Sequence, residues 1–308
     1  MSWQRIVAGV DASPEGAGAA RRAWRLAQAT GAECDLVHTT VDVSAVPATL
    51  EHDIDLEALM DHVTAAARKE VEEELRGNVP PEALDRLDVV MGKPGWTLPQ
   101  EVRRRDADLL VLGGKHHSRL RRWHGGSLAH YAVCKVDVPT FVTTPRNTMI
   151  ERVVVGVDLS DAAAATINAG KYVAEIFDAG LRVVHAIEPA PSTYPVYPWG
   201  LDTYRRYAKE HFHDMMDAIG GNEWIQRAIR EGPAARVLAD EAAEWDADLL
   251  VVGSHGKGFV DRMLLGSTTQ GLLYRLPTSL LVVPVGVTSS KTTIEEQEQK
   301  NLQQYTLA

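Results

Sequence analysis

One stretch in the second half of the sequence combines glycine, serine and threonine at a spacing suited to holding phosphate. Gly253-Ser254-His255-Gly256 is followed, after nine residues, by Gly266-Ser267-Thr268. Glycine lets the backbone pass close to an anion, and the amides and hydroxyls at the start of a helix can bind phosphate oxygens. The spacing differs from that of a Walker A loop and of a dinucleotide fingerprint. A glycine-rich loop with a serine helix cap is the plainer interpretation.

The first half of the sequence has a related segment of different composition. Gly113-Gly114-Lys115-His116 precedes Gly126-Ser127, again after nine residues, and His116 stands where the later segment has Gly256. A side chain at that position would obstruct a backbone path close to phosphate. The positive side chains nearby suit an anion, although a solvated charged loop explains them equally well; they are Lys115, Arg119, Arg121 and Arg122.

These segments belong to two copies of one longer unit. Residues 6–13 (IVAGVDAS) return as residues 153–160 (VVVGVDLS), and residues 106–113 (DADLLVLG) as residues 246–253 (DADLLVVG). A repeat of this length is too long for a solenoid unit, so each copy is predicted to be a complete domain. We expect domains at 1–146 and 150–287, followed by a polar tail at 288–308.

Short apolar, β-branched runs alternate with helical patterns in each copy. In the first copy such runs predict parallel strands buried on both faces, at residues 5–10, 35–40, 87–91, 109–112 and 140–143. Between them, apolar residues recur every three or four positions from Leu56 to Leu75, and Gly77 with Pro80-Pro81 ends that helix. The alternation predicts an α/β fold of two tandem, doubly wound, Rossmann-like parallel sheets.

The composition is that of an ordinary globular protein. The 308 residues are 45% hydrophobic and 24% charged, and the net charge of -10 argues against a general binder of nucleic acid. The chain starts without the apolar core of a signal peptide, and no segment has the roughly 18 apolar residues that a membrane span needs. We therefore expect a cytoplasmic protein with neither nucleic acid nor a membrane as its partner.

Together, these motifs resemble those of the universal stress protein family. The resemblance rests on Asp158 and Ser160, on Val184-His185, and on the segments DLLVVGSHGK, LGST and LPTSLLVVP at residues 248–257, 265–268 and 276–284. It covers both halves, as in the tandem members, and implies a fold similar to the adenine nucleotide alpha hydrolases. Because the last strands of family members pair across a dimer, residues 140–143 and 280–283 are expected to pair within this chain as a pseudo-dimer. The sequence leaves open whether two chains form a homodimer.

The resemblance implies an ATP site in the second copy, with Mg²⁺ or another divalent metal on the phosphates. The matching positions for the adenine and ribose are Gly156, Val157, Asp158, Ala186, Val252 and Gly253, and those for the phosphates are His255, Gly256, Gly266, Ser267 and Thr268. Asp158 would equally suit a cap for the following helix. The first copy is expected to be degenerate or to bind another anion through Asp11, Gly113, Lys115, His116, Arg119, Gly126 and Ser127.

Two functions of different classes agree with these features. The favoured one is a stress-response regulator whose conformation or partner depends on a bound adenine nucleotide. The alternative is a slow ATPase, but no residue supplies an obvious general base for water, so we assign no catalytic residue. An interaction protein of the same fold without nucleotide is a third interpretation.

Other reactive side chains are expected to be structural. Ser254-His255 lacks the nucleophile elbow of a hydrolase, and His211 and His213 point to different faces of a predicted helix, so no metal site is expected. Cys34 and Cys134 cannot form a disulfide framework and are expected to pack in the interior.

Overall fold

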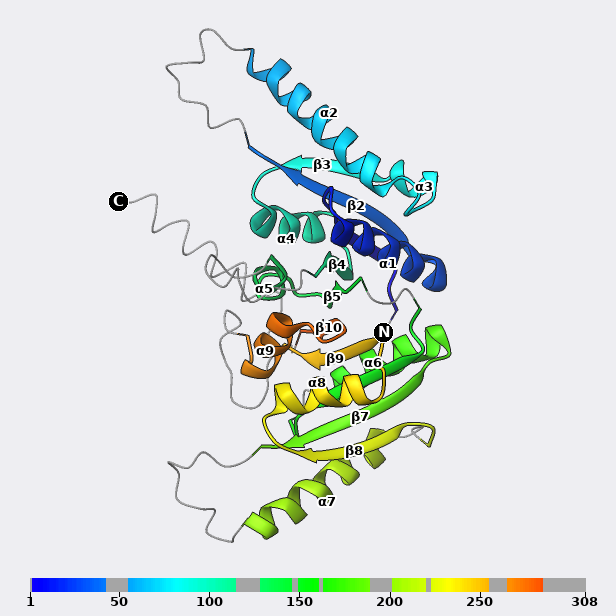
Figure 1. Cartoon of the computed structure of the whole chain (residues 1–308), viewed down its shortest axis with the longest axis vertical. Helices are drawn as coiled ribbons and strands as arrows, with labels where there is room; N and C mark the ends of the chain where they lie inside the picture. The colour runs from blue at the N-terminus through cyan, green and yellow to red at the C-terminus, as the bar shows by residue number, and fades with distance from the viewer. Residues whose placement is uncertain are drawn as a thin grey trace, which may run out of the picture.

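The computed structural model describes residues 2–42, 55–114, 128–145, 149–160, 163–188, 201–219, 223–254 and 265–284. Within these ranges, one ten-stranded sheet runs through the whole molecule in the order β3-β2-β1-β4-β5-β10-β9-β6-β7-β8 (Figure 1). The order of the second five strands mirrors that of the first five, so the molecule consists of two similar halves joined at β5 and β10.

The first domain is a parallel sheet with helical crossovers. Its strands are β1 (Arg5–Gly9), β2 (Glu33–Thr40), β3 (Leu87–Met91), β4 (Leu109–Gly113) and β5 (Thr140–Thr143). Its helices are α1 (Pro14–Thr30), α2 (Leu56–Leu75), α3 (Pro81–Leu84), α4 (Pro94–Arg104) and α5 (Leu128–Val133). All five predicted strands are confirmed, although β2 starts two residues earlier than the sequence pattern indicated. The predicted helix over residues 56–75 is confirmed as well.

The second domain repeats this arrangement. Its strands are β6 (Arg152–Val157), β7 (Gly180–Ile187), β8 (Gln226–Glu231), β9 (Leu249–Gly253) and β10 (Ser279–Val283). Its helices are α6 (Ala163–Phe177), α7 (Leu201–Ile219), α8 (Ala234–Glu244) and α9 (Ser267–Arg275). The predicted fold of two tandem doubly wound domains is therefore confirmed.

The two domains join through the only antiparallel strand pair among the described strands. Leu281 of β10 lies opposite Phe141 of β5, and both side chains are fully buried. Beside this pair, the Thr144 backbone N–H donates to Ser279 Oγ at 3.2 Å. Because the pairing buries apolar side chains and satisfies backbone groups of both domains, it confirms the predicted intramolecular pseudo-dimer.

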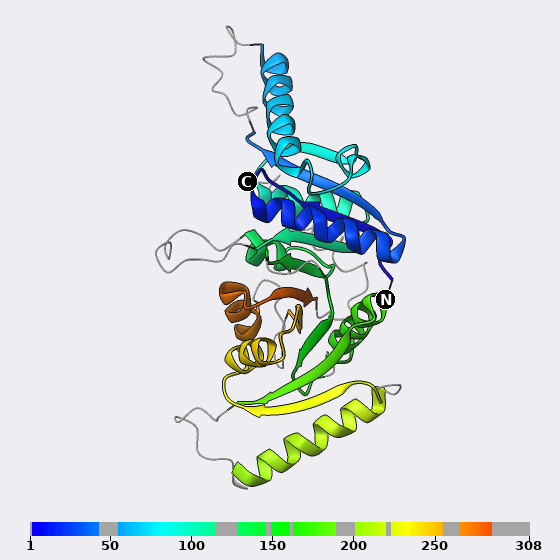
Figure 2. The ribbon, with the colours of Figure 1, turned by 45° about the vertical axis from the view of Figure 1, so that its right-hand side comes forward.

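Helices cover both faces of the sheet, and α2 and α7 lie at opposite ends of the long axis (Figure 2). Side chains of α1, α2, α3, α6 and α7 pack with one face, and side chains of α4, α5, α8 and α9 pack with the other. Neighbouring residues of a strand alternate between these cores, as Val154 and Val155 do on β6. This two-sided burial explains why the strand sequences are continuously apolar. Among the described helices, none has the length and apolar character of a membrane span.

Candidate functional site

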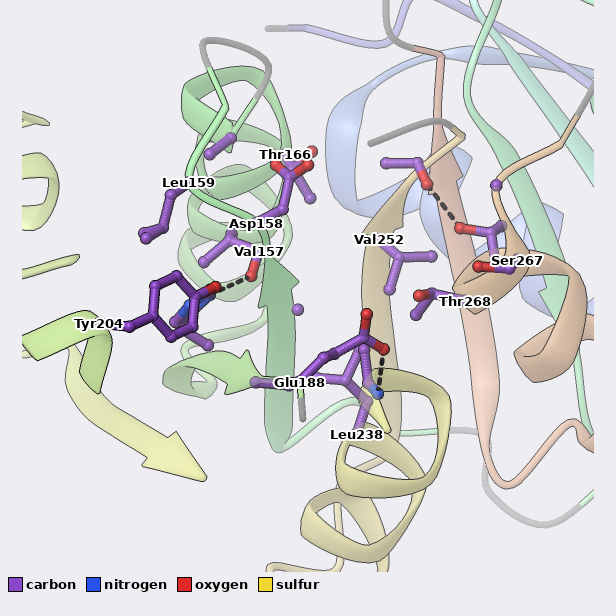
Figure 3. Close-up of a pocket in the computed structure, with 18 residues that line it drawn as sticks. Val157, Asp158, Leu159, Thr166, Glu188, Tyr204, Leu238, Val252, Ser267 and Thr268 are labelled. Carbon is purple, nitrogen blue, oxygen red and sulfur yellow. Dashed lines mark hydrogen bonds between the residues drawn. The ribbon is translucent and has the colours of Figure 1, made fainter. Parts of the chain in front are cut away.

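A cavity of about 370 Å³ opens at the carboxyl ends of β6, β7 and β9. This is the edge at which ligands bind in open α/β sheets. Figure 3 shows residues from β6 and α6 on one side of the cavity, residues from β9 and α9 on the other, and Glu188 and Leu238 between them. The lining is mixed: polar groups meet at the helix and strand ends, and apolar side chains form the remaining walls.

The floor of the cavity depends on a glycine in β6. A Cβ placed on Gly156 would lie 2.5 Å from Leu238 Cδ1 and 2.8 Å from its Cδ2, which is closer than real Cβ contacts. A larger residue at this position would force the Leu238 side chain to shift away from the end of β6. Leu238 is nearly fully buried, and its side chain forms part of the cavity wall.

Asp158 follows β6 and is held by the turn that leads towards α6. Its Oδ1 accepts hydrogen bonds from the Ser160 hydroxyl and from the Ser160 backbone N–H, the latter at 3.3 Å. The first domain has the same arrangement, because the Ser13 hydroxyl donates to Asp11 Oδ1. Asp158 therefore fixes its own loop, as a capping residue does, while its side chain also lines the cavity.

His185 links the ends of two neighbouring strands. Its Nδ1 lies 3.0 Å from the Val157 carbonyl oxygen, which can only accept, so Nδ1 carries the proton. The ring is buried and stacks on Phe212 of α7, with 6.0 Å between the ring centroids. This contact places Ala186, the next residue of β7, at the rim of the cavity.

The start of α9 has backbone and hydroxyl groups suited to an anion. Gly266 is the N-cap and has no side-chain hydrogen bond to the helix, while its own N–H donates to the Ser254 carbonyl at 2.9 Å. The Thr269 hydroxyl donates to the Gly253 carbonyl at 2.7 Å and so ties the first turn to the end of β9. The first N–H groups of a helix have no partner within the helix and carry its positive partial charge. With Ser267 exposed and Thr268 half-buried, this turn presents amides and hydroxyls to an anion.

The structure brings nine of the eleven residues predicted for the second-domain site to this one cavity: Gly156, Val157, Asp158, Ala186, Val252, Gly253, Gly266, Ser267 and Thr268. The other two, His255 and Gly256, lie outside the described residues. The other residues that line the cavity were not predicted from the sequence, and they are Leu159, Ala163, Thr166, His185, Glu188, Tyr204, Ala234, Leu238 and Thr269. Of these, Glu188 was open to prediction, since it directly follows a strand that ends at the same edge of the sheet.

In the first domain, the start of α1 lies against the carboxyl ends of β1 and β4, which correspond to β6 and β9 in the second domain. A Cβ on Gly113 would lie 2.5 Å from the carbonyl oxygen of Glu15, and a Cβ on Gly16 would lie 2.3 Å from the carbonyl oxygen of Asp11. Asp11 and Gly113 thus lie at the same end of the sheet, beside the first turn of α1. The other predicted anion-site residues lie outside the described part of the chain: Lys115, His116, Arg119, Gly126 and Ser127.

The cysteines differ in burial, and the two histidines of α7 are exposed on the helix. Cys34 on β2 is buried, and burial, with a contribution from the neighbouring Asp35, raises the pKa of its thiol to about 12. Cys134 follows α5 and is half-buried, so its expected burial is only partial. His211 stacks on Tyr207, whereas His213 packs against Phe212. Across the described ranges, no group of three or more metal-ligating side chains could hold an ion.

Comparison with known proteins assigns both halves of the chain to the same family. The sequence profile of the universal stress protein family matches residues 2–144 and again residues 149–284. The chain belongs to the universal stress protein family. Two matches, together spanning nearly all of the described residues, agree with a tandem member.

Individual family members resemble one half or the whole of the chain. A universal stress protein of Mycolicibacterium smegmatis is 31% identical over 140 residues, covering 42% of this chain and 47% of that relative, so the match spans about half of its length. One from Thermus aquaticus is 29% identical over 137 residues, covering 44% of this chain and 99% of the relative. The crystal structure of a universal stress protein from Archaeoglobus fulgidus superposes with a TM-score of 0.67 at 17% identity, covering 92% of this chain and 98% of that one. This last likeness shows the two-domain fold.

Proposed function

We propose that this universal stress protein is a stress-response regulatory protein that binds an adenine nucleotide, ATP, in its second domain. The observation that carries the proposal is the cavity at the ends of β6, β7 and β9, into which the N-terminus of α9 faces. An uncapped helix start at the carboxyl edge of a parallel sheet is a site for phosphate. The volume of about 370 Å³ lies within the range of small-molecule sites.

The remaining walls suit the nucleoside. Leu159, Leu238 and Val252 supply apolar surface for a base, and Asp158 supplies a carboxylate acceptor for a donor on the base or ribose. The phosphates would lie at Gly266, Ser267 and Thr268, where amides and hydroxyls meet the positive end of α9. This assignment divides the cavity into a phosphate end at α9 and a nucleoside end at β6 and β7.

We place the principal site in the second domain because the first is built differently. There, the backbone of Glu15 lies against Gly113, and Gly16 lies against Asp11, so the start of α1 takes up space beside the strand ends. At the position of Gly16, the second domain has Ala163, whose side chain lines the cavity. These contacts support a first domain that is degenerate or takes a different anion.

A divalent metal fits the phosphate end of this cavity. Ser267 and Thr268 offer hydroxyl oxygens, whereas the described residues include no ready-made cage of carboxylates. Mg²⁺ prefers such sites, where phosphate oxygens and water complete its coordination. When bound, the ion would neutralise phosphate charge, and the amides at the start of α9 would orient the same phosphates.

Calorimetric titration of the nucleotide-free full chain with ATP, with and without Mg²⁺, tests the proposal. We expect one ATP per chain and no release of phosphate from the complex. Two equal sites would contradict the difference between the domains. Steady release of phosphate would favour the slow ATPase, and an absence of binding would favour an interaction protein of the same fold.

A further inference from the structure

One exposed acidic side chain that lines the cavity is hydrogen-bonded to the start of α8. Glu188 directly follows β7, and its Oε1 accepts a hydrogen bond from the Ala234 backbone N–H at 2.8 Å. Ala234 is the first residue of α8, and the N-cap residue Pro233 makes no side-chain hydrogen bond to the helix. The Glu188 carboxylate therefore caps α8 from outside the helix, at the end where the helix dipole favours negative charge.

The first domain lacks both the carboxylate acceptor and the N–H donor of this hydrogen bond. β2 ends at Thr40 as β7 ends at Ile187, so Val41 occupies the position of Glu188, and its side chain is 67% exposed. α4 begins at Pro94 as α8 begins at Ala234, and proline has no N–H to donate. Because α4 has no N–H at this position, the first domain needs no acceptor there, and the carboxylate and its donor occur together in the second domain.

The position of Glu188 in the cavity indicates what it would contact. Figure 3 shows its side chain reaching towards the interior, between the side that carries Tyr204 and the side that carries Thr268. A carboxylate can only accept hydrogen bonds, so it needs a donor on the ligand and repels phosphate. Because a carboxylate repels phosphate and Glu188 follows β7, we assign the group near Glu188 to the nucleoside. Its donors are the ribose hydroxyls and the amino group of adenine.

We propose that Glu188 is a specificity-determining residue of the second-domain site, whose carboxylate accepts a hydrogen bond from a donor on the nucleoside. The inference rests on the proposed binding of ATP and adds to it the selection of the ligand. Glu188 is exposed in the nucleotide-free chain, and its Oε1 already accepts from Ala234, so a nucleotide without the matching donor would cover the second carboxylate oxygen without giving it a partner.

The test compares the affinities of the wild-type chain and Glu188→Gln for four nucleotides. ATP carries every donor, 2′-deoxy-ATP and 3′-deoxy-ATP each lack one ribose hydroxyl, and ITP has a carbonyl in place of the amino group. The glutamine keeps an oxygen for the Ala234 N–H and turns an amide donor towards the ligand. We expect the wild type to prefer ATP over one analogue by about tenfold or more, and the variant to lose that preference.

The analogue that is discriminated against identifies the donor: a deoxy-nucleotide points to the ribose, and ITP to the adenine amino group. In the latter case Glu188→Gln is expected to favour ITP. Glu188→Val, which copies the first domain, provides a second variant that should also abolish the preference.

Equal affinity of the wild type for all four nucleotides, or a preference that survives in both variants, would overturn the inference and leave Glu188 as a cap for α8 alone. A wild type that binds none of them would refute the proposed function itself. Urea unfolding of the nucleotide-free variants checks that both are folded.

Discussion

A negative charge at the first residue of α9 is predicted to weaken ATP binding without weakening the fold. Ser267 is exposed and begins the helix, so Ser267→Glu requires no repacking. At about 6 Å and an effective dielectric constant of about 20–40, each unit of phosphate charge would repel the new carboxylate by about 1.4–2.8 kcal/mol. For one net phosphate charge beside α9, the affinity for ATP should therefore fall by about tenfold to a hundredfold.

The stability of the nucleotide-free protein is expected to change in the opposite direction. A carboxylate in the first turn of a helix interacts favourably with the helix dipole, by about 0.3–1 kcal/mol. Urea unfolding of Ser267→Glu should thus give an unchanged or slightly higher midpoint, while titration calorimetry at fixed ionic strength shows the loss of affinity. Because the two effects have opposite signs, misfolding cannot account for weaker binding.

The matched control is Ser127→Glu, at the corresponding sequence position of the first copy. If the second domain holds the nucleotide, this variant should bind ATP as the wild type does. Wild-type affinity in Ser267→Glu, or an equal loss in Ser127→Glu, would refute the placement of the phosphates at α9.

Three further predictions concern stability. Gly16→Ala should destabilise the fold by about 2 kcal/mol, because the new Cβ would meet the Asp11 backbone at 2.3 Å. Gly18→Ala should instead stabilise the fold by up to about 1 kcal/mol, because the nearest atom to its Cβ would be 3.8 Å away. Glu241→Gln should cost about 1–2 kcal/mol, because the buried carboxylate pairs with Arg182 at 2.6 Å and Arg230 at 3.0 Å, while both arginines keep contact with solvent. The raised pKa of Cys34 predicts that the wild type loses stability relative to Cys34→Ala as the pH rises. The difference in the free energy of unfolding should be constant below about pH 8.5 and should change by about 1.4 kcal/mol per pH unit above it.

Urea unfolding checks all three predictions. Equal effects of alanine at Gly16 and Gly18 would contradict the close approach of α1 to the Asp11 loop. Asp240→Asn on the exposed side of α8 is the control for Glu241 and should change stability by less than about 0.5 kcal/mol. A difference between the wild type and Cys34→Ala that stays constant from pH 8 to pH 10 would contradict the buried, protonated thiol.

The repeat made the fold predictable from the sequence. Residues 6–13 match residues 153–160, so an apolar run that predicts a strand in one copy has a counterpart in the other. Each copy therefore supported the strand predictions made for the other. The resemblance to the universal stress protein family placed Asp158 and Val252 in one site, and the cavity brings both together.

Contacts between distant elements were not predictable in the same way. Leu238 and Tyr204 reach the cavity from helices whose positions depend on how the crossovers pack, and no short motif surrounds either residue. Arg22 is a second example: its charge suggests a surface position, yet it lies 5.5 Å from the Phe141 ring centroid and is only 3% exposed. Burial, with the nearby Arg25, lowers its pKa to about 10. Such burial arises from the packing of α1 over β5.

The central claim, that the second domain holds the nucleotide, is tested most directly by photo-crosslinking. The full chain is labelled with 8-azido-ATP in the presence and absence of excess ATP, and the labelled peptides are identified by mass spectrometry. The account predicts ATP-protected labelling within residues 149–284. Protected labelling confined to residues 2–144, or equal in both domains, would contradict it.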